Sequence, residues 1–370
     1  MLTDKYCKIF REDLAAWFDR ECRNLPWRET GDPYNIWISE IMLQQTQVSK
    51  VIPYYTRFIT AFPDIKTLAE VDLDRVLKVW EGLGYYARAR NIHKTAGIIL
   101  HEFQSVYPEE YAQIASLPGI GPYTAAAIAS IAFNQQYAVV DGNVRRVLCR
   151  ILRFIDDPDT SQGKMKLQDF ADTLLDKAHP GNYNQALMEL GALVCTPKNP
   201  RCEDCPLSVY CLARAAGEQQ VFPMHKPVKK RPHYNIAAGL ICNGEKLLIA
   251  RRPEKGMLGG LWEFPGGKQE PGESLDNTVV REVREELDVQ VQVEKPVTTI
   301  NHQYTHFTIT LHIYICTFIG GEPKPLGCTD WRWVSVPELK DYAFPRANVK
   351  IIEKLLAGDI QLLSNTKLRI

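Results

Sequence analysis

Two carboxyl side chains in the first half of the chain have the surroundings that acid–base chemistry needs. Glu40 lies among Ile38, Ile41 and Leu43, and an apolar setting of this kind raises the pKa of a carboxyl so that it holds a proton to donate. Asp141 follows an apolar run and precedes a helical pattern, which predicts an N-cap whose helix favours the anion. An ionised carboxylate can stabilise developing positive charge or attack a carbon. For either residue alone, an exposed helix glutamate or a structural cap is the commoner interpretation.

Four of the ten cysteines form a cluster with the spacing Cys195-x6-Cys202-x2-Cys205-x5-Cys211. Thiols grouped in this way indicate a metal centre, whereas the six scattered cysteines are typical of ordinary buried thiols. Four thiolates in one short loop suit either a tetrahedral zinc ion or an iron–sulfur cluster, and the spacing alone does not separate the two.

A third group of candidate residues is acidic. Glu282, Glu285 and Glu286 stand at positions i, i+3 and i+4 of a predicted helix over residues 274–288, so they share one helix face. Oxygen-only ligands suit Mg²⁺. The alternative is a solvated charged face without a ligand.

The elements that must position these residues fall into two classes, which predict two domains. We expect residues 1–215 to form a mainly α domain, because apolar residues recur at helical spacing and residues 125–133 resemble a buried helix. Residues 216–234 are polar, basic and proline-containing, as in a linker. Residues 235–370 alternate β-branched and aromatic strands with the helix over 274–288, which predicts an α+β domain with helices around a mixed sheet.

The segment LPGIGPYTA, residues 117–125, follows one helical pattern and opens another. Gly119 and Gly121 allow a tight turn and a close backbone approach, Pro122 suits a first helical position, and free amides at the helix start can hold a DNA phosphate. With VVDGNVRRV, residues 139–147, this segment resembles the helix–hairpin–helix DNA glycosylase superfamily that includes endonuclease III. A plain helical hairpin is the alternative for the first motif alone.

Two further segments resemble the MutY family of adenine DNA glycosylases: IWISEIMLQQTQV, residues 36–48, and GLGYYARAR, residues 82–90. The resemblance implies excision of adenine opposite 8-oxoguanine or guanine in duplex DNA, with Glu40 as general acid. It places Gln45 and Tyr85 at the positions that wedge into the base stack. The residues that it places around the adenine are Arg28, Leu43 and Gln185. Candidate phosphate contacts, or else solvated helix residues, are Arg88, Arg90, Arg145 and Arg146.

The residue at position 123 distinguishes glycosylases with lyase activity from those without it. Superfamily members with lyase activity carry a lysine two residues after the second hairpin glycine, and that lysine forms a Schiff base. Tyr123 occupies this position, and a phenol cannot form a Schiff base. We therefore expect a monofunctional enzyme. The alternative function is an endonuclease III-like glycosylase with lyase activity.

The resemblance also bears on both metal sites. The cysteine spacing is similar to that of the 4Fe–4S loop of endonuclease III and MutY, which favours this cluster over zinc. The glutamates belong to a segment that resembles a Nudix box, with Asp288 where the box has glycine. Its other matching positions are Gly267, Glu273 and Arg281.

Residues 235–370 therefore have two candidate roles. MutY proteins end in a MutT-like domain that reads 8-oxoguanine, and Tyr304, Thr305 and His306 occupy the corresponding reading loop. A Mg²⁺-dependent hydrolysis of 8-oxo-dGTP is the second role, since Asn348 falls where MutT reads the base.

The composition excludes some partners. The chain of 370 residues has 44 basic and 44 acidic side chains, so DNA contacts must come from local patches and backbone amides rather than overall charge. Its longest apolar stretches are too short to span a bilayer, and residues 1–10 lack a signal pattern. We expect a cytoplasmic monomer with no membrane contact.

Overall fold

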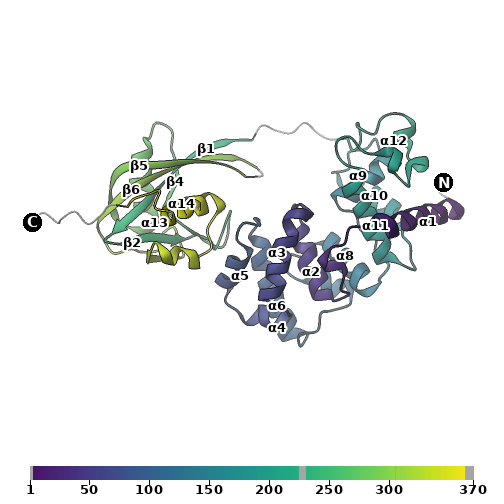
Figure 1. Cartoon of the computed structure of the whole chain (residues 1–370), viewed down its shortest axis with the longest axis horizontal. Coiled ribbons are helices and arrows are strands. Elements are labelled where there is room, and N and C mark those ends of the chain that lie inside the picture. Colours follow the sequence, from purple (N-terminus) through teal and green to yellow (C-terminus); the bar gives the residue numbers. More distant parts are fainter. Residues whose placement is uncertain (1–2, 225–230, 305, 363–370) are drawn as a thin grey trace, which may run out of the picture. The chain divides into compact units, whose positions relative to one another are not determined.

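The computed structural model describes residues 3–224, 231–304 and 306–362. Contacts divide the chain into two compact units, one formed by residues 1–70 and 91–228 and the other by residues 71–90 and 229–370. The first unit is helical and the second is built on a sheet (Figure 1). The helical first half and the α+β second half predicted from sequence are both confirmed.

The helices of the first half begin where the sequence provides caps and prolines. Pro33, Pro122 and Pro180 each stand at the first position of a helix, where a missing N–H costs nothing. The helices are α1 (Asp4–Glu21), α2 (Pro33–Leu43), α3 (Val48–Ala61), α4 (Ile65–Glu70), α5 (Leu73–Trp80), α6 (Ala87–Glu102), α7 (Tyr111–Ser116), α8 (Pro122–Phe133), α9 (Gly142–Ile151), α10 (Ser161–Leu174), α11 (Pro180–Leu193) and α12 (Leu212–Ala215). Short 3-10 turns lie at Pro26–Arg28, Cys202–Asp204 and Ser208–Tyr210.

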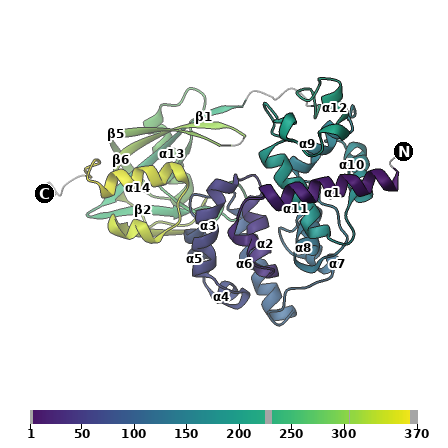
Figure 2. The same cartoon turned by 45° about the vertical axis from the view of Figure 1, so that its right-hand side comes forward.

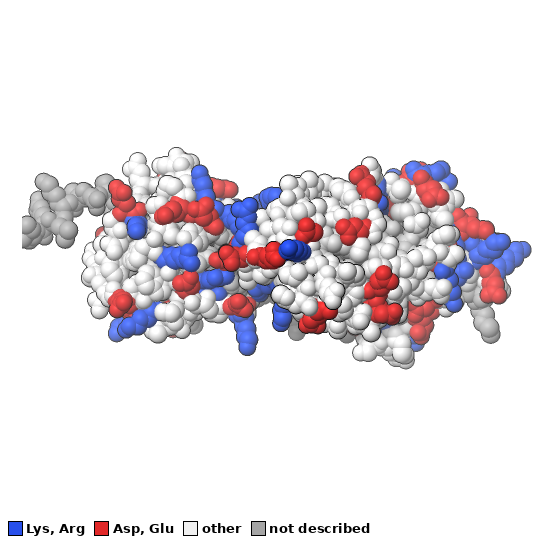
Figure 3. Space-filling model, turned by 90° about the horizontal axis from the view of Figure 1, so that it is seen from below, with Lys and Arg blue, Asp and Glu red and all other residues white. Residues whose placement is uncertain are grey.

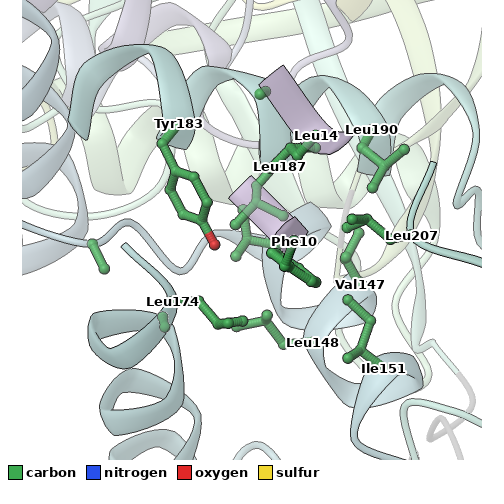
Figure 4. Packing of buried hydrophobic residues seen from close by; sticks show 14 of the residues in the cluster. Phe10, Leu14, Val147, Leu148, Ile151, Leu174, Tyr183, Leu187, Leu190 and Leu207 are labelled. Carbon is green, nitrogen blue, oxygen red and sulfur yellow. The ribbon is translucent and has the colours of Figure 1, made fainter. Parts of the chain in front are cut away.

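One hydrophobic core of the first unit lies between α1, α9, α10 and α11. Phe10 and Leu14 of α1 meet Leu148 of α9 and Leu187 of α11 there, as Figure 4 shows. All four side chains are at most 1% exposed. Because α9 and α11 are fixed against each other by this packing, residues at their ends have defined positions relative to one another.

The second unit contains a seven-stranded mixed sheet. Its strands are β1 (His233–Asn243), β2 (Lys246–Arg251), β3 (Trp262–Glu263), β4 (Gly266–Lys268), β5 (Gln290–Gln303), β6 (Thr308–Gly320) and β7 (Asp330–Ser335). The order is β3-β2-β1-β6-β5, with β4 paired to β1 and β7 to β2. Strands β1 and β6 run parallel, and the other pairs are antiparallel.

Two helices cover opposite faces of this sheet (Figure 2). The first is α13 (Leu275–Leu287), and the second is α14 (Arg346–Leu356), which follows the 3-10 turn Pro337–Asp341. Alternation along the strands supplies both cores: Leu247 and Ile249 belong to the core that includes α14, whereas Leu248 and Ala250 belong to the core that includes α13.

Charges are mixed on the molecular surface. On the face drawn in Figure 3, lysines and arginines are interspersed with aspartates and glutamates. This distribution agrees with the zero net charge. It supports DNA contacts by local groups rather than by a broad basic field.

Candidate active site

Glu40 is buried inside the first unit. Asp32 caps α2 by accepting a hydrogen bond from the Tyr34 amide at 2.9 Å, and the helix is apolar around most of its circumference, so it packs in the interior. Glu40 is only 5% exposed, which excludes a solvated helix glutamate. Burial raises the pKa of its carboxyl to about 7, as its apolar setting predicts.

Tyr123 is the immediate partner of that carboxyl. Its hydroxyl donates a hydrogen bond to Glu40 Oε2 at 2.9 Å. Tyr123 is the second residue of α8, and the turn before it depends on Gly119, which has a φ of 78° and no room for a Cβ beside Asn91. Gly121, the N-cap, has open space where a Cβ would stand. The hairpin therefore places the Tyr123 hydroxyl against the Glu40 carboxyl. It also leaves space at Gly121 for the backbone of a ligand.

Asp141 caps α9, as the sequence predicts. Its carboxylate accepts hydrogen bonds from the Val144 amide at 2.6 Å and from the Asn143 side chain at 3.2 Å. Burial raises the pKa of Asp141, and the bonds at the helix start and the Arg146 charge, which favour the anion as expected, only partly offset this rise.

One cavity of about 880 Å³ joins these residues. Its walls include all three candidate catalytic side chains, all three candidate adenine contacts and one of the two candidate wedges: Glu40, Tyr123, Asp141, Arg28, Leu43, Gln185 and Gln45. A second groove of about 940 Å³ shares part of this lining and continues past Tyr111 and Tyr137, whose rings stack at 4.3 Å. The first cavity thus brings an acid and a carboxylate to one concave site.

Arg28 is held by Glu189, a residue that the sequence did not indicate. Glu189 of α11 pairs with Arg28 at 3.0 Å and with Arg23 at 2.7 Å, and its side chain is 2% exposed. Burial acts to raise the pKa of Glu189, but the bonds from the two arginines hold it at about 2. Arg28 also lowers the pKa of Glu40. Glu189 stands four residues after Gln185, on the same helix face, which is the only hint that the sequence contains.

The four arginines considered as phosphate contacts have partners within the protein. Arg146 donates to the Cys195 and Gly191 carbonyls at 2.7 Å and to Asn143 at 2.9 Å. Arg145 pairs with Asp159, and Arg90 donates to a backbone carbonyl. Arg88 is 8% exposed and lies over an aromatic ring. Each of them thus has an interaction within the protein, and phosphate contact by any of them stays a prediction.

The two candidate wedge residues share a backbone conformation. Gln45 and Tyr85 have φ angles of 56° and 51°, and residues other than glycine rarely adopt positive φ angles. Gln45 is exposed and Tyr85 is 38% exposed. Both side chains therefore extend from tight, strained turns, and each turn belongs to a different structural unit.

The four clustered cysteines line one small cavity of about 30 Å³. Burial raises the pKa of the Cys205 thiol to about 12, and the three neighbouring thiols raise it further. The Arg150 guanidinium is 2% exposed and donates to Cys195 Sγ at 3.2 Å. Within the described residues, no three histidine, cysteine or acidic side chains are arranged for a single metal ion. Converging sulfur ligands beside a buried cation suit a multi-iron cluster.

The predicted acidic face of residues 274–288 is present on α13. Asp288 ends this helix in the left-handed conformation, with a φ of 57°, so the aspartate does replace glycine there. Arg281 binds Glu273 at 2.8 Å and both Glu282 and Glu285 at 3.1 Å.

A buried carboxylate that the sequence did not indicate extends this group. Glu263 of β3 is paired with Arg252, and it raises the pKa of Glu286, which burial brings to about 8. The Glu282 carboxylate fills the space where a side chain at Gly267 would stand. Glu263, Glu282 and Glu286 thus interact electrostatically, although among the described residues no three acidic side chains are placed to hold one metal ion.

Only part of the predicted lesion-reading loop is described. Tyr304 stacks on Phe307 at 4.8 Å, and His306 is exposed. Thr305 lies outside the described residues. Tyr304 lines a cavity of about 140 Å³ together with Asn348 and Glu263.

Comparison with known proteins gives consistent relatives. The adenine DNA glycosylase of Homo sapiens is 33% identical, over 92% of this chain and 73% of that protein. The adenine DNA glycosylase of Buchnera aphidicola subsp. Schizaphis graminum is 35% identical, over 93% of this chain and 98% of its own. This chain belongs to the adenine DNA glycosylase family. It is a DNA glycosylase, a hydrolase of base excision repair that acts on DNA.

Three family models match successive parts of the chain. Residues 38–172 match the HhH-GPD superfamily of base excision DNA repair proteins, residues 195–211 the iron–sulfur binding domain of endonuclease III, and residues 237–354 the NUDIX domain. A solved structure of a thermostable thymine-DNA glycosylase is 28% identical, with a TM-score of 0.53 over 58% of this chain and all of that one.

Two broader points about the glycosylase follow, one from these matches and one from its helices. Cys195, Cys202, Cys205 and Cys211 fall within the match to the iron–sulfur domain, so zinc is not favoured and the chain binds an iron–sulfur cluster. In the described part of the chain, no helix is long and apolar enough to cross a membrane.

Proposed function

We propose that this glycosylase removes adenine mispaired with 8-oxoguanine or guanine in duplex DNA. The observation that carries the proposal is the single cavity in which Glu40, Tyr123 and Asp141 meet. A base in a duplex must leave the stack to reach such a cavity. The positions of Gln45 and Tyr85 on tight turns suit them to filling the space that the base vacates.

Glu40 acts as the general acid in this proposal. With a pKa of about 7, a large fraction of its carboxyl is protonated at neutral pH. Transfer of this proton to N7 of adenine lets the base leave with the electron pair of the glycosidic bond. Tyr123 holds the carboxyl in one orientation, and Arg28 limits the rise of its pKa.

Asp141 acts on the sugar. As positive charge develops at C1′, the Asp141 carboxylate stabilises this charge or forms a bond to C1′. The positive charge on the sugar favours the ionised form of Asp141 despite its burial. Water then supplies the oxygen at C1′, and its proton restores the acid. No Schiff base forms at residue 123, because that residue is a tyrosine, so the product retains an intact strand with one abasic site.

The direct test compares two duplexes, one with a single adenine opposite 8-oxoguanine and one with adenine opposite thymine. Alkali cleaves the strand where a base has been lost. The proposal expects alkali-dependent cleavage only at the mispaired adenine. Equal cleavage of both duplexes, or cleavage without alkali, would contradict it.

We also propose that the four cysteines hold a 4Fe–4S cluster with a structural role, and that the enzyme acts as a monomer in the cytoplasm. We assign catalysis to a domain of residues 1–215 and treat residues 216–234 as a linker. Residues 235–370, which come after the linker, are assigned the reading of the lesion. Tyr304, Thr305 and His306 are its proposed contacts. A truncation after residue 220 is expected to excise adenine slowly and to lose the preference for 8-oxoguanine over guanine.

A second candidate function, hydrolysis of 8-oxo-dGTP, is favoured by one observation. Burial raises the pKa of Glu263, Glu282 and Glu286, and the charge of Glu282 raises the pKa of both Glu263 and Glu286 further. Divalent cations neutralise such groups of carboxylates. Mg²⁺ held by Glu282, Glu285 and Glu286 would activate water against a phosphoanhydride. Arg281 orients Glu282 and Glu285.

The test of this second function is Glu282→Gln. If the wild type releases monophosphate from 8-oxo-dGTP in Mg²⁺, and the variant does not but still excises adenine, then the protein has both activities. No release by the wild type would leave lesion reading as the only role of this domain.

A further inference from the structure

The turn that carries Tyr85 is attached to the Nudix domain. Residues 71–90 belong to the same compact unit as residues 229–370, although they lie within the match to the glycosylase superfamily, residues 38–172. Helix α5 and the turn after it therefore connect one family region to the other. The contacts within this unit show how the connection is made.

Glu81 is the central group of this attachment. Its Oε1 accepts a hydrogen bond from the Phe344 amide at 2.8 Å, and its other oxygen pairs with Lys78 at 2.8 Å. Lys78 also donates to the Tyr342 carbonyl at 2.9 Å. The Glu81 side chain is 18% exposed and Phe344 is fully buried. Charge-assisted bonds with little water access are stronger than neutral ones.

Two further contacts lie near the two ends of residues 71–90. Arg251 pairs with Asp74 of α5 at 2.5 Å, and Arg90 donates to the Gly259 carbonyl. Gly259 is in a turn so tight that a Cβ would stand 2.2 Å from the Glu254 carbonyl oxygen. The Nudix domain thus contacts both ends of this segment, through a side chain at Asp74 and through a backbone carbonyl at Arg90.

The Tyr85 turn itself is constrained. Gly84 has a φ of 85° and Tyr85 a φ of 51°, and the Gly84 carbonyl accepts hydrogen bonds from the Trp80 indole at 3.0 Å and from Arg88 at 3.1 Å. The Arg88 guanidinium lies 5.1 Å from the centre of the Tyr85 ring. The direction of Tyr85 therefore depends on the end of α5 from which the turn starts.

The two segments that receive α5 also line the cavity beside Tyr304. Met257 and Leu258 precede Gly259, while Pro345 and Asn348 follow Phe344, and all four line the same cavity of about 140 Å³. A group that enters this cavity contacts the segments that hold the Tyr85 turn.

We propose that Glu81 is a positioning residue that couples this cavity to Tyr85. Contact of the lesion base in the duplex with Tyr304, at the lining of this cavity, and insertion of Tyr85 into the duplex then favour each other through the Phe344 segment. The coupling rests on the proposed reading of 8-oxoguanine by the Nudix domain. It makes α5 part of lesion discrimination rather than of catalysis.

The experiment uses the full chain with Glu81→Gln, and with Glu70→Gln as the matched control. Glu70 makes only a long, exposed pair with Lys66 at 4.0 Å, which contributes little. The measured quantity is the ratio of single-turnover excision rates for adenine opposite 8-oxoguanine and opposite guanine. We expect Glu81→Gln to lower this ratio about tenfold, the factor that weakening one charge-assisted bond gives. Glu70→Gln is expected to leave it as in the wild type.

Two further measurements keep the result interpretable. The ratio of excision rates is also measured for Tyr304→Ala and for the double variant Glu81→Gln/Tyr304→Ala, because coupled residues have non-additive effects. We expect the double variant to have the same ratio as Tyr304→Ala. 2-Aminopurine beside the adenine reports unstacking, which is expected to weaken in Glu81→Gln. Cooperative thermal melting of each variant establishes that it is folded.

The outcomes separate the two proposals. If Glu81→Gln lowers both excision rates equally, or neither, the coupling is wrong. If Tyr304→Ala lowers the ratio but Glu81→Gln does not, lesion reading stands and the coupling is overturned. If neither Tyr304→Ala nor Glu81→Gln lowers the ratio, lesion reading through Tyr304 and the coupling both fail.

Discussion

Replacing Glu40 by Gln is expected to abolish excision and, in alkaline solution, to stabilise the fold. Burial raises the pKa of Glu40 from 4.5 to about 7, so the folded state binds a proton that the unfolded state releases. Stability therefore falls as pH rises from about 4.5 to about 7, by about 3 kcal/mol in total at 1.36 kcal/mol for each unit of pKa. Glutamine keeps the shape of the side chain and an acceptor for Tyr123 but carries no charge. The unfolding free energy of the variant therefore does not fall in this pH range.

Glu189→Gln provides a matched control with the opposite sign. The two arginines hold the pKa of Glu189 at about 2, below its ordinary value of 4.5. This carboxylate stabilises the fold above about pH 4.5, and the contribution is lost as pH falls toward 2. Its removal at neutral pH is expected to cost about 3 kcal/mol and to leave Arg23 and Arg28 without their shared partner.

Both variants are measured by guanidinium unfolding at about pH 5 and about pH 8.5, with single-turnover excision on the same preparations. We expect Glu40→Gln to exceed the wild type in unfolding free energy only at the higher pH, while its excision falls by about 10²–10⁴-fold or more. Glu189→Gln is expected to be less stable than the wild type at both. A Glu40→Gln protein that is equally destabilised at both pH values would refute a buried carboxyl with a raised pKa.

The remaining predictions concern the partners of the acid and the metal site. Tyr123→Phe removes the bond that lowers the pKa of Glu40, so the pH above which excision declines is expected to move upward; a downward shift of the rate profile would contradict this. Borohydride is expected not to trap wild-type enzyme on DNA, since efficient trapping requires an amine such as lysine at position 123. Asp141→Asn is expected to abolish adenine release but retain binding of the mispair in a gel-shift assay, and near-normal excision would exclude its proposed role. Cys205→Ser is expected to lose the visible iron–sulfur absorption of the yellow-brown wild type, and a colourless wild type with stoichiometric zinc would show that the metal is wrong.

The sequence alone was sufficient where chemistry depends on local pattern. Periodicity and capping residues predicted α2, α8, α9 and α13 and the N-cap role of Asp141, because helix boundaries depend on neighbouring side chains. The strand-like segments from residue 235 onward became β1, β2, β5, β6 and β7, because alternation already specifies two buried faces. The cysteine spacing indicated a metal centre for the same local reason.

Only the tertiary structure decided which distant groups meet and what their charges become. The pairing of Tyr123 with Glu40 joins residues 83 positions apart, and that of Glu189 with Arg23 joins residues 166 apart. Neither separation leaves a periodic signal. The same holds for Glu81 and Phe344, and for Glu263 beside Glu286. Asp141 shows the physical reason most clearly: its cap was visible in the sequence, but the direction of its pKa shift depends on how much water the whole fold removes from it, and burial is a property of the packed chain rather than of its neighbours in sequence.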